Sequence, residues 1–322
     1  MLITSFVVAA LIEVLLPIAL GYYFWKKLGA TWRVFFIGVA AFLVSQIIHV
    51  PLLMLRSYLY GANGAALSAL PAMAQYALDA VLVGLLAAVC EEPARYFAFK
   101  ILKARGNSSR SALMLGAGHG GLESILVGVS VIGSTISLIM FQTNPNSFAN
   151  IGMEQLSSLM QLVQTPWYMP LLGAFERVAA VVLHLSLSLL VWRSIHSRKI
   201  GFLFLAMLVH TLVNALTVFL SYLGWSALAV EGVMAVVLVL SLVYIYFTMW
   251  GYGRDTLYDD SKLPEEEPEF EDEEALEGDE LAVGEMADDE LAAGELAEVS
   301  EYAGDEDAGE VLDEVAAEDP EA

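Results

Sequence analysis

Seven stretches of this chain are almost entirely apolar, and each is long enough to cross a bilayer as a helix. A spanning helix needs about 20 such residues, because its backbone must satisfy its own hydrogen bonds inside the hydrocarbon. The stretches are Ile3 to Trp25, Val34 to Leu55, Tyr76 to Leu102, Ala112 to Phe141, Met169 to Trp192, Gly201 to Leu223 and Leu228 to Trp250. The sequence therefore predicts an all-α, polytopic membrane helix bundle of about seven transmembrane helices. The fourth stretch is long and rich in glycine, which leaves room for a tilted or broken helix.

Composition supports this class and separates the chain into two parts. Hydrophobic residues make up 57% of the 322 residues, against about 45 to 50% in soluble domains. Only eight of the 38 acidic residues precede Arg254, so the net charge of -23 belongs to the segment that follows. We expect a transmembrane domain over residues 1–254 and an acidic, low-complexity tail over residues 255–322. Low hydrophobicity and dense like charge predict that the tail is disordered.

Basic residues gather in alternate connections between the apolar stretches, while the opposite connections contain only Arg56. The clusters are Lys26, Lys27 and Arg33, then Lys100, Lys103, Arg105 and Arg110, then Arg193, Arg198 and Lys199, and finally Arg254. The positive-inside rule then places the N-terminus outside and the tail in the cytoplasm (N-out/C-in). The tail would serve solubility or bind a cytoplasmic partner.

The third apolar stretch carries Glu91, Glu92 and Arg95 near its middle. A charge at the bilayer centre costs about 2.5 to 3.5 kcal/mol on insertion scales. Ionisable residues at such positions usually face the bundle interior or a wet cavity, and they commonly mark function. The sequence therefore indicates a polar cavity around this stretch.

Three histidines from three other stretches share the depth of Glu91 when depth is measured from the cytoplasmic basic residues. The separations are nine residues from Lys100 to Glu91, nine from Arg110 to His119, nine from Arg193 to His184 and eleven from Lys199 to His210. At 1.5 Å per residue all four lie about 13 to 17 Å from those markers. Four helices are thus expected to bring one carboxylate and three imidazoles to one level.

Spacing within each stretch adds polar partners on the same helix face, because residues four apart are neighbours on a helix. The pairs are Glu91 with Arg95, His119 with Glu123, and His210 with Asn214. Glu91 and Glu92 are successive residues about 100° apart around the axis. We therefore expect one of them to act on the substrate and the other to support it, without choosing between them.

The chemistry that this combination favours is hydrolysis. A buried carboxylate can act as general base toward water with an imidazole partner, while His and Asn side chains can donate hydrogen bonds to a developing oxyanion. Alternatively, His119, His184 and His210 with Glu123 could bind Zn²⁺ and leave a position open for water. The sequence contains no HExxH motif, so it supports activated water more firmly than it supports a metal ion.

Other features have plainer interpretations. The run Gly116 to Gly121 around His119 could serve close helix packing or close approach of a substrate backbone. Glu176 and Arg177 could neutralise each other, and Cys90 is typical of a small buried residue. Four polar residues are isolated within apolar stretches, which is typical of interhelical hydrogen bonding or snorkelling: Glu13, His49, Asp79 and Glu231.

Together the polar motifs resemble those of the YhfC family of intramembrane proteases, which is related in pattern to the PrsW and CAAX-processing (CPBP) families. The matching residues are Glu91-Glu92-x-x-Arg95, Gly118-His119-Gly120-Gly121-x-Glu123, His184 and His210-x-x-x-Asn214, within residues 1–250. The CPBP pattern has three residues between the second Glu and Arg, whereas this chain has two. The resemblance implies a membrane hydrolase that cuts peptide bonds in or near the bilayer, either as a metalloprotease or as a glutamic-type enzyme without metal.

On that resemblance Glu91 would be the base, His119 its partner on the water, and His210 with Asn214 would bind metal or stabilise the oxyanion. We expect a multi-pass protein of the plasma membrane whose catalytic domain is residues 1–254. Its partners would be the lipid bilayer and a membrane-anchored peptide or protein substrate, with no nucleic acid. The alternatives are a proton-coupled transporter, which predicts a polar file across the whole membrane and an inverted repeat, and a non-enzymatic scaffold acting through the tail.

Overall fold

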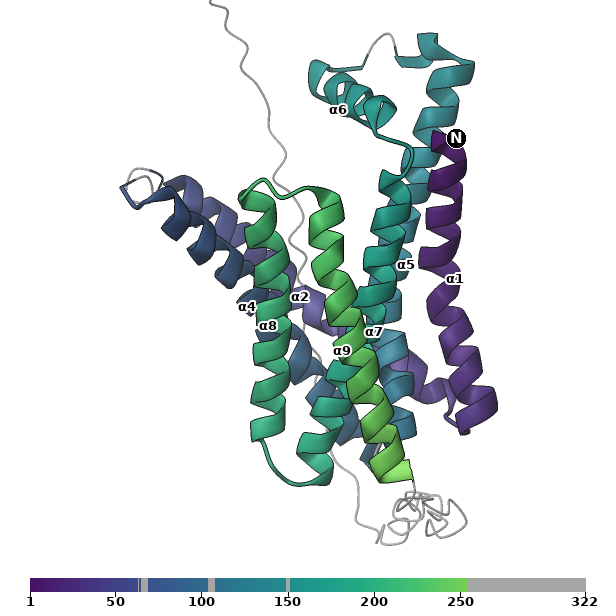
Figure 1. The fold of residues 1–322 in the computed structure, drawn as a ribbon, viewed down its shortest axis with the longest axis vertical. Coiled ribbons are helices and arrows are strands. Elements are labelled where there is room, and N and C mark those ends of the chain that lie inside the picture. The colour runs from purple at the N-terminus through teal and green to yellow at the C-terminus, as the bar shows by residue number, and fades with distance from the viewer. Residues whose placement is uncertain (63, 65–68, 104–107, 149–150, 254–322) are drawn as a thin grey trace, which may run out of the picture. The chain divides into compact units, whose positions relative to one another are not determined.

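The computed structural model describes residues 1–62, 64, 69–103, 108–148 and 151–253, and these are helical with no strand among them. The predicted disordered tail, residues 255–322, lies outside the described residues. The helices are α1 (Leu2–Leu28), α2 (Trp32–Ala62), α4 (Ala72–Leu102), α5 (Ser109–Thr143), α6 (Met153–Gln164), α7 (Met169–His196), α8 (Gly201–Tyr222) and α9 (Ala227–Gly253), with a short 3₁₀ turn η2 (Pro145–Phe148) after α5 (Figure 1).

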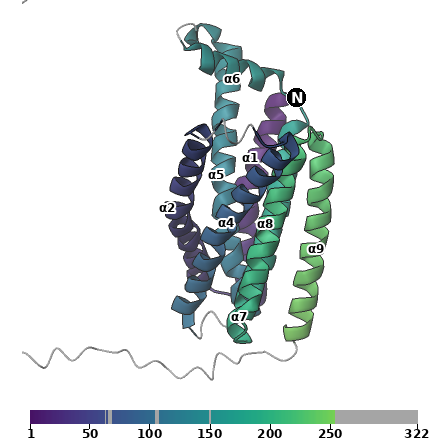
Figure 2. The same ribbon diagram turned by 90° about the vertical axis from the view of Figure 1, so that its left-hand side faces the viewer.

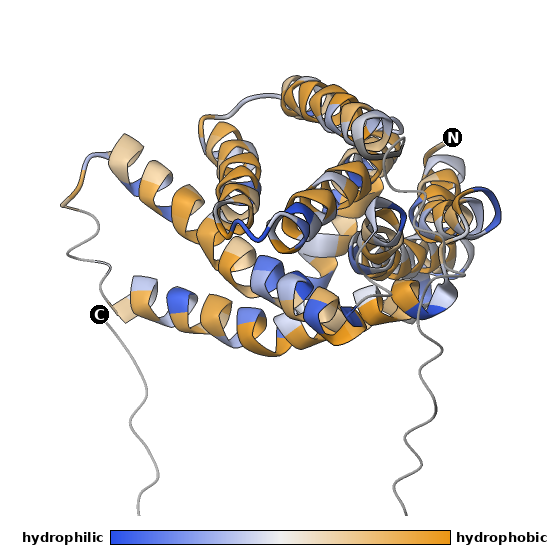
Figure 3. Ribbon diagram, turned by 90° about the horizontal axis from the view of Figure 1, so that it is seen from below, coloured by the Kyte–Doolittle hydropathy of each residue, from blue (hydrophilic) through white to orange (hydrophobic). Residues whose placement is uncertain are grey.

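Seven of these helices, all except α6, are long and apolar enough to cross a membrane. Figure 3 shows that apolar residues predominate along their ribbons. The prediction of an all-α, seven-helix integral membrane protein is confirmed. The fourth spanning helix, α5, is one continuous helix of 35 residues and is not broken. The orientation of the bundle across the membrane stays a prediction.

Helix α7 lies at the centre of the bundle. It packs against α1, α5, α8 and α9, and it also contacts α4. Within its most apolar window 78% of the residues are buried, whereas the other six spanning helices reach only 17 to 33%. Side chains of α7 can therefore meet groups from several helices at once.

Close packing of α5 against its neighbours depends on its glycines. Gly118 lies against the backbone of Phe35 in α2, where an added Cβ would overlap the Phe35 carbonyl oxygen. Gly120 lies against His184 in α7, and a Cβ there would come within 2.6 Å of the His184 Cβ. Of the two interpretations of this glycine run, helix packing is the one that the structure supports, because neighbouring helices already occupy both faces.

The bundle in Figure 2 shows α2 and α9 on opposite sides, with α4, α5, α7 and α8 between them. The buried apolar core fills the end of the bundle that carries the connections α1–α2 and α7–α8, which is the end with the basic clusters. Its members include Phe99 of α4, Leu115 of α5, and Leu187 and Trp192 of α7. A dry, packed layer therefore separates the mid-bundle polar residues from the basic end.

The connection from Gln142 to Tyr168 contains Pro145 and Pro166, residues that are typical of turns in a surface loop. The structure instead forms α6 between the two prolines, and α6 packs against α5. The prolines lie outside the helix, and a repeated apolar spacing that includes the buried Leu159 gives α6 a face to pack.

Candidate active site

The four residues that share one depth in the sequence also lie close together in the structure; they are Glu91, His119, His184 and His210. Nε2 of His119 in α5 lies 3.1 Å from Oε2 of Glu91 in α4. The ring centroids of His119 and His184 are 5.7 Å apart, and those of His184 in α7 and His210 in α8 are 5.5 Å apart. All four side chains are buried. Helices distant in the sequence thus converge on one acid and three imidazoles.

Arg95 joins the two adjacent glutamates. Its guanidinium donates to Oε1 of Glu92 and lies 3.5 Å from Oε2 of Glu91. Nδ1 of His210 lies 2.7 Å from the same Oε1 of Glu92. Glu92 and Arg95 are fully buried, and a buried ion pair of this kind needs such additional hydrogen bonds to offset its desolvation. Glu92 is therefore occupied with holding Arg95 and His210.

His184 links this group to a second ion pair. Arg95 donates to Nδ1 of His184, and Nε2 of His184 lies 2.8 Å from Oε2 of Glu123 in α5. Nη1 of Arg177 in α7 lies 2.9 Å from the other carboxylate oxygen of Glu123. Glu176 in turn accepts from Arg177 at 2.6 Å. The pairing of Glu176 with Arg177 considered from the sequence is present, and it extends a continuous hydrogen-bonded network.

A cavity of about 150 Å³ opens onto this network. Glu91, His184 and His210 line it, as do Asn214 and Glu123, whereas Glu92 does not. The volume is enough for a few water molecules, since one occupies about 30 Å³ in the liquid. The paired glutamates therefore have different surroundings: Glu91 faces space that can hold water, and Glu92 faces only protein.

The ligands needed for a metal ion are present at one point. One donor atom each from Glu91, His119 and His184 lies within 4.8 Å of the other two. Two imidazoles and a carboxylate are a combination that binds Zn²⁺ in hydrolytic sites. In addition, Nδ1 of His119 is buried and has no hydrogen-bond partner among the described residues. The donor set fits a metal ion, with His210 and Glu123 beside this group rather than in it.

His49 of α2, which the sequence suggested to be an isolated interhelical or snorkelling residue, lines the same cavity. Its Nδ1 lies 3.2 Å from Oε1 of Gln46, one helical turn away. His49 is 16 residues from Arg33, not nine to eleven, so the depth criterion passed over it. By contrast, Asp79 makes the interhelical contacts that were predicted, to Arg56 of α2 and Tyr222 of α8.

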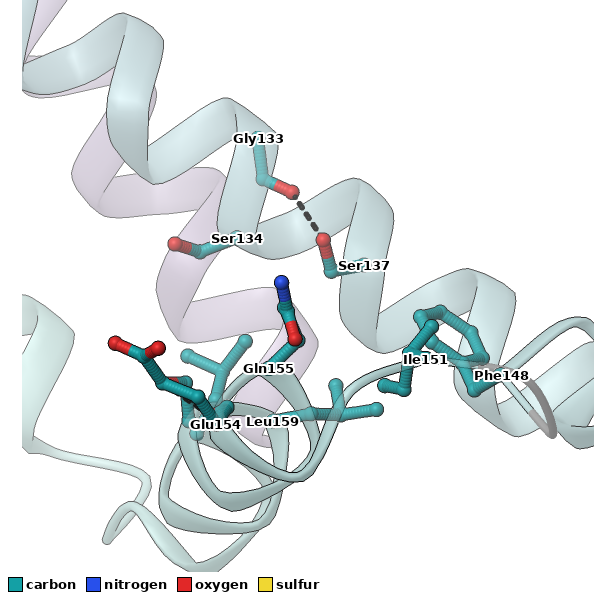
Figure 4. Close-up of a pocket in the computed structure, with 10 residues that line it drawn as sticks. Gly133, Ser134, Ser137, Phe148, Ile151, Glu154, Gln155 and Leu159 are labelled. Carbon is teal, nitrogen blue, oxygen red and sulfur yellow. Dashed lines mark hydrogen bonds between the residues drawn. The ribbon is translucent and has the colours of Figure 1, made fainter. Parts of the chain in front are cut away.

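A second hollow of about 800 Å³ lies between the outer end of α5 and α6 (Figure 4). Ser134, Ser137 and Gln155 contribute neutral polar groups to a lining that also contains apolar side chains such as Phe148 and Leu159, and the Ser137 hydroxyl donates to the Gly133 carbonyl of its own helix. Glu154 is the one carboxylate among its lining residues, which include no histidine. This hollow therefore lacks the combination of acid and imidazole that the buried cavity has.

The chain is similar to known membrane proteins. Residues 12–239 match the model of a family described as YhfC intramembrane metalloprotease. The chain is 33% identical over 249 residues to the uncharacterized membrane protein YhfC of Bacillus subtilis (strain 168), and the alignment covers 73% of this chain and 91% of that protein. No solved structure matches the chain.

Proposed function

The chain belongs to the YhfC intramembrane metalloprotease family, and we propose that its buried acid and imidazole cluster hydrolyses peptide bonds of membrane-associated substrates. The observation that carries the proposal is the 3.1 Å contact between Glu91 and His119 beside a cavity that can hold water. Hydrolysis in a bilayer requires a base, water and donors at one point, and these helices supply groups suited to each role.

In the glutamic-type mechanism, without a metal ion, Glu91 is the proposed base. Oε2 of Glu91 contacts Nε2 of His119. We therefore assign Oε1 of Glu91 as the oxygen that accepts a proton from a water molecule in the cavity. A positioned general base contributes about 10²- to 10⁴-fold to such reactions. Glu92 is not the proposed base, since its Oε1 is engaged with Arg95 and His210 and its side chain does not line the cavity.

The developing oxyanion is assigned to His210 and Asn214. Both line the cavity from α8 and are one helical turn apart, so both can face the same substrate carbonyl. The hydrogen bond from Nδ1 of His210 to Glu92 orients the imidazole. Donation from the other ring nitrogen to the oxyanion requires His210 to carry a proton on both nitrogens, a form that the Glu92 carboxylate stabilises. Arg95 acts as a positioning residue through its contacts to both glutamates.

A metal ion, for which we propose Zn²⁺, would be held by Glu91, His119 and His184. Such an ion would act as a Lewis acid on the substrate carbonyl and promote deprotonation of water. His184 would have to give up one of its two hydrogen bonds, to Arg95 or to Glu123, in order to bind it. His119 already has a buried ring nitrogen with no partner among the described residues.

The test is cleavage of a membrane-anchored peptide by the purified protein, with Glu91→Gln and His119→Ala beside the wild type. We expect each variant to lose about 10²-fold or more of the activity. Asp79→Asn is the matched control, because it makes the same acid-to-amide change in α4 and leaves the cleavage rate unchanged. If the Glu91→Gln and His119→Ala proteins cleave as fast as the wild type, the proposal fails.

Metal content separates the metalloprotease from the glutamic-type mechanism. Elemental analysis of purified wild-type protein should find Zn²⁺ at about one ion per chain. His119→Ala and His184→Ala should each lower that content, because each removes one of the three donors. A chelator should remove both ion and activity, and Zn²⁺ should restore them. Full activity of metal-free protein would instead favour the glutamic-type mechanism.

A further inference from the structure

The cavity extends in one direction only from the proposed catalytic residues. Counted from the basic residues that end α4 and α7, Glu91 and His184 lie about 13 Å deep. The lining residues Arg177 and Thr217 lie about 24 and 27 Å from Arg193 and Lys199, which places them well toward the end that carries the N-terminus. No described lining residue is nearer the basic end than Glu91 and His184.

The other direction is closed by apolar side chains. Leu187 and Trp192 follow His184 along α7 and are almost completely buried, as is Leu115, one helical turn before His119 in α5. These residues belong to the packed core at the basic end. Close-packed apolar interiors leave few voids large enough for water. Leu115, Leu187 and Trp192 do not line the cavity, so the described cavity offers water no path in this direction.

The exposed fraction of the acidic side chains that line the cavity increases with distance from Glu91 toward the end of the bundle that carries the N-terminus. The side chain of Glu91 is 6% exposed, that of Glu123 is 30% exposed, and that of Glu176 is 40% exposed. Both Glu123 and Glu176 line the cavity, so at least part of this exposed surface faces the same space. The network thus becomes more open with distance from the proposed base.

Two further buried glutamates lie close to this open end. The backbone carbonyl of Glu13 in α1 accepts from Ser124, the residue that follows Glu123, and Glu231 in α9 lies about one helical turn before Met234, which lines the cavity. Both glutamate side chains are more than nine-tenths buried. In each, Oε2 has no hydrogen-bond partner among the described residues. Arg177 already pairs with Glu123 and Glu176. Buried polar groups without a partner are costly, and water is what usually satisfies them.

We propose that Glu13, Glu176, Arg177 and Glu231, here called the acidic tract, form the route by which water enters the site from the end of the bundle that carries the N-terminus. The inference rests on the proposed hydrolase, because hydrolysis consumes one water for each bond cut. The tract supplies water to Glu91, and its carboxylates keep the open end of the cavity hydrated.

Thiol accessibility tests the route without requiring catalysis. In a Cys90→Ala background, Ala180→Cys places a thiol on the cavity wall, and Ala179→Cys places one at nearly the same depth in a buried position off that wall. A charged, membrane-impermeant methanethiosulfonate reagent is added to right-side-out and inside-out vesicles. We expect labelling at position 180 from the N-terminal side, about tenfold faster than at position 179, because a thiol reacts as its hydrated thiolate.

Thr217→Cys on the cavity wall and Leu216→Cys on the outer face of α8 form a second pair, should Ala180→Cys fail to fold. Labelling of the wall position from the basic side only, or labelling as slow as its control from both sides, overturns the route. Cleavage by a protein that shows no such labelling would leave the hydrolase standing and reject the route alone. Labelling of the wall position in a protein that shows no cleavage activity would support the water route and reject the hydrolase.

Substitutions at Glu231 test whether the tract holds the water. Glu231→Leu removes the buried carboxylate and should slow labelling at position 180 about tenfold, since an apolar lining loses its water. Glu231→Gln keeps a polar group of the same size and should label at the rate of the parent. Equal labelling rates in the Leu and Gln variants would show that the carboxylates do not hydrate the opening and would overturn their role.

Discussion

Nε2 of His184 lies 2.8 Å from Oε2 of Glu123, while Arg95 donates to the opposite ring nitrogen. Arginine has only donors, so Nδ1 of His184 must accept and Nε2 must carry the proton that Glu123 receives. Both nitrogens of His184 are thus engaged by protein groups. Glu123 in turn accepts from Arg177, which ties the orientation of this imidazole to α5 and to the outer half of α7.

The first prediction concerns Glu123 as a positioning residue. Glu123→Ala removes the acceptor for His184 and should lower cleavage activity about 10- to 100-fold, as loss of a supporting contact does in metal sites. Glu123→Gln keeps an amide oxygen that can accept from His184 and Arg177, and it should restore most of the activity. If Glu123 were instead a metal ligand, the Gln variant would lose bound metal, which elemental analysis would detect.

The second prediction separates the paired glutamates by stability. Glu92→Gln removes the negative charge that Arg95 and His210 both contact, and leaving a buried arginine without its partner costs about 3 to 5 kcal/mol. Glu91→Gln should cost much less, because Glu91 faces the cavity and makes the longer contact to Arg95. Thermal unfolding in detergent measures both. Equal losses would contradict the supporting role of Glu92.

The third prediction uses two glycines of α5. Gly120→Ala places a Cβ within 2.6 Å of His184 and should displace that imidazole, with a cost of about 1 to 3 kcal/mol and loss of cleavage activity. Gly133→Ala is the control, because its Cβ would meet no atom within 4 Å, and alanine favours the helix by about 1 kcal/mol. The cleavage activity and thermal unfolding of both variants test this prediction. A Gly120→Ala protein with normal activity would show that His184 is not tightly placed.

The fourth prediction concerns the outer ends of α4 and α8. Oη of Tyr222 lies 2.5 Å from Oδ2 of Asp79, whose other oxygen accepts from Arg56, and the Tyr222 ring stacks on Tyr76. Tyr222→Phe keeps the stacking and removes one hydrogen bond, so it should lower stability by about 1 kcal/mol. Because these residues lie outside the cavity lining, the cleavage rate should not change. A large fall in cleavage rate with unchanged stability would link this contact to catalysis.

The sequence by itself determined where the spanning helices lie in the chain and how deep each polar residue lies along its helix. Apolar stretches of spanning length located all seven transmembrane helices, and several observed helices extend a few residues past the predicted ends. Residue counts from basic clusters placed Glu91, His119, His184 and His210 at one depth, where the structure also brings them together. Both inferences work because helix rise is constant and the bilayer has a fixed thickness.

Only the tertiary structure decided which polar groups pair. The depth of Glu91 along α4 is nearly the same as that of Glu92, so depth does not distinguish them. In the structure Glu91 contacts His119 beside the cavity, whereas Glu92 contacts His210 and Arg95 away from it. Depth also cannot show that His49 reaches the cavity. These outcomes depend on how each helix is rotated about its axis, and that rotation is set by contacts between helices distant in sequence, such as the approach of Gly118 to the backbone of α2.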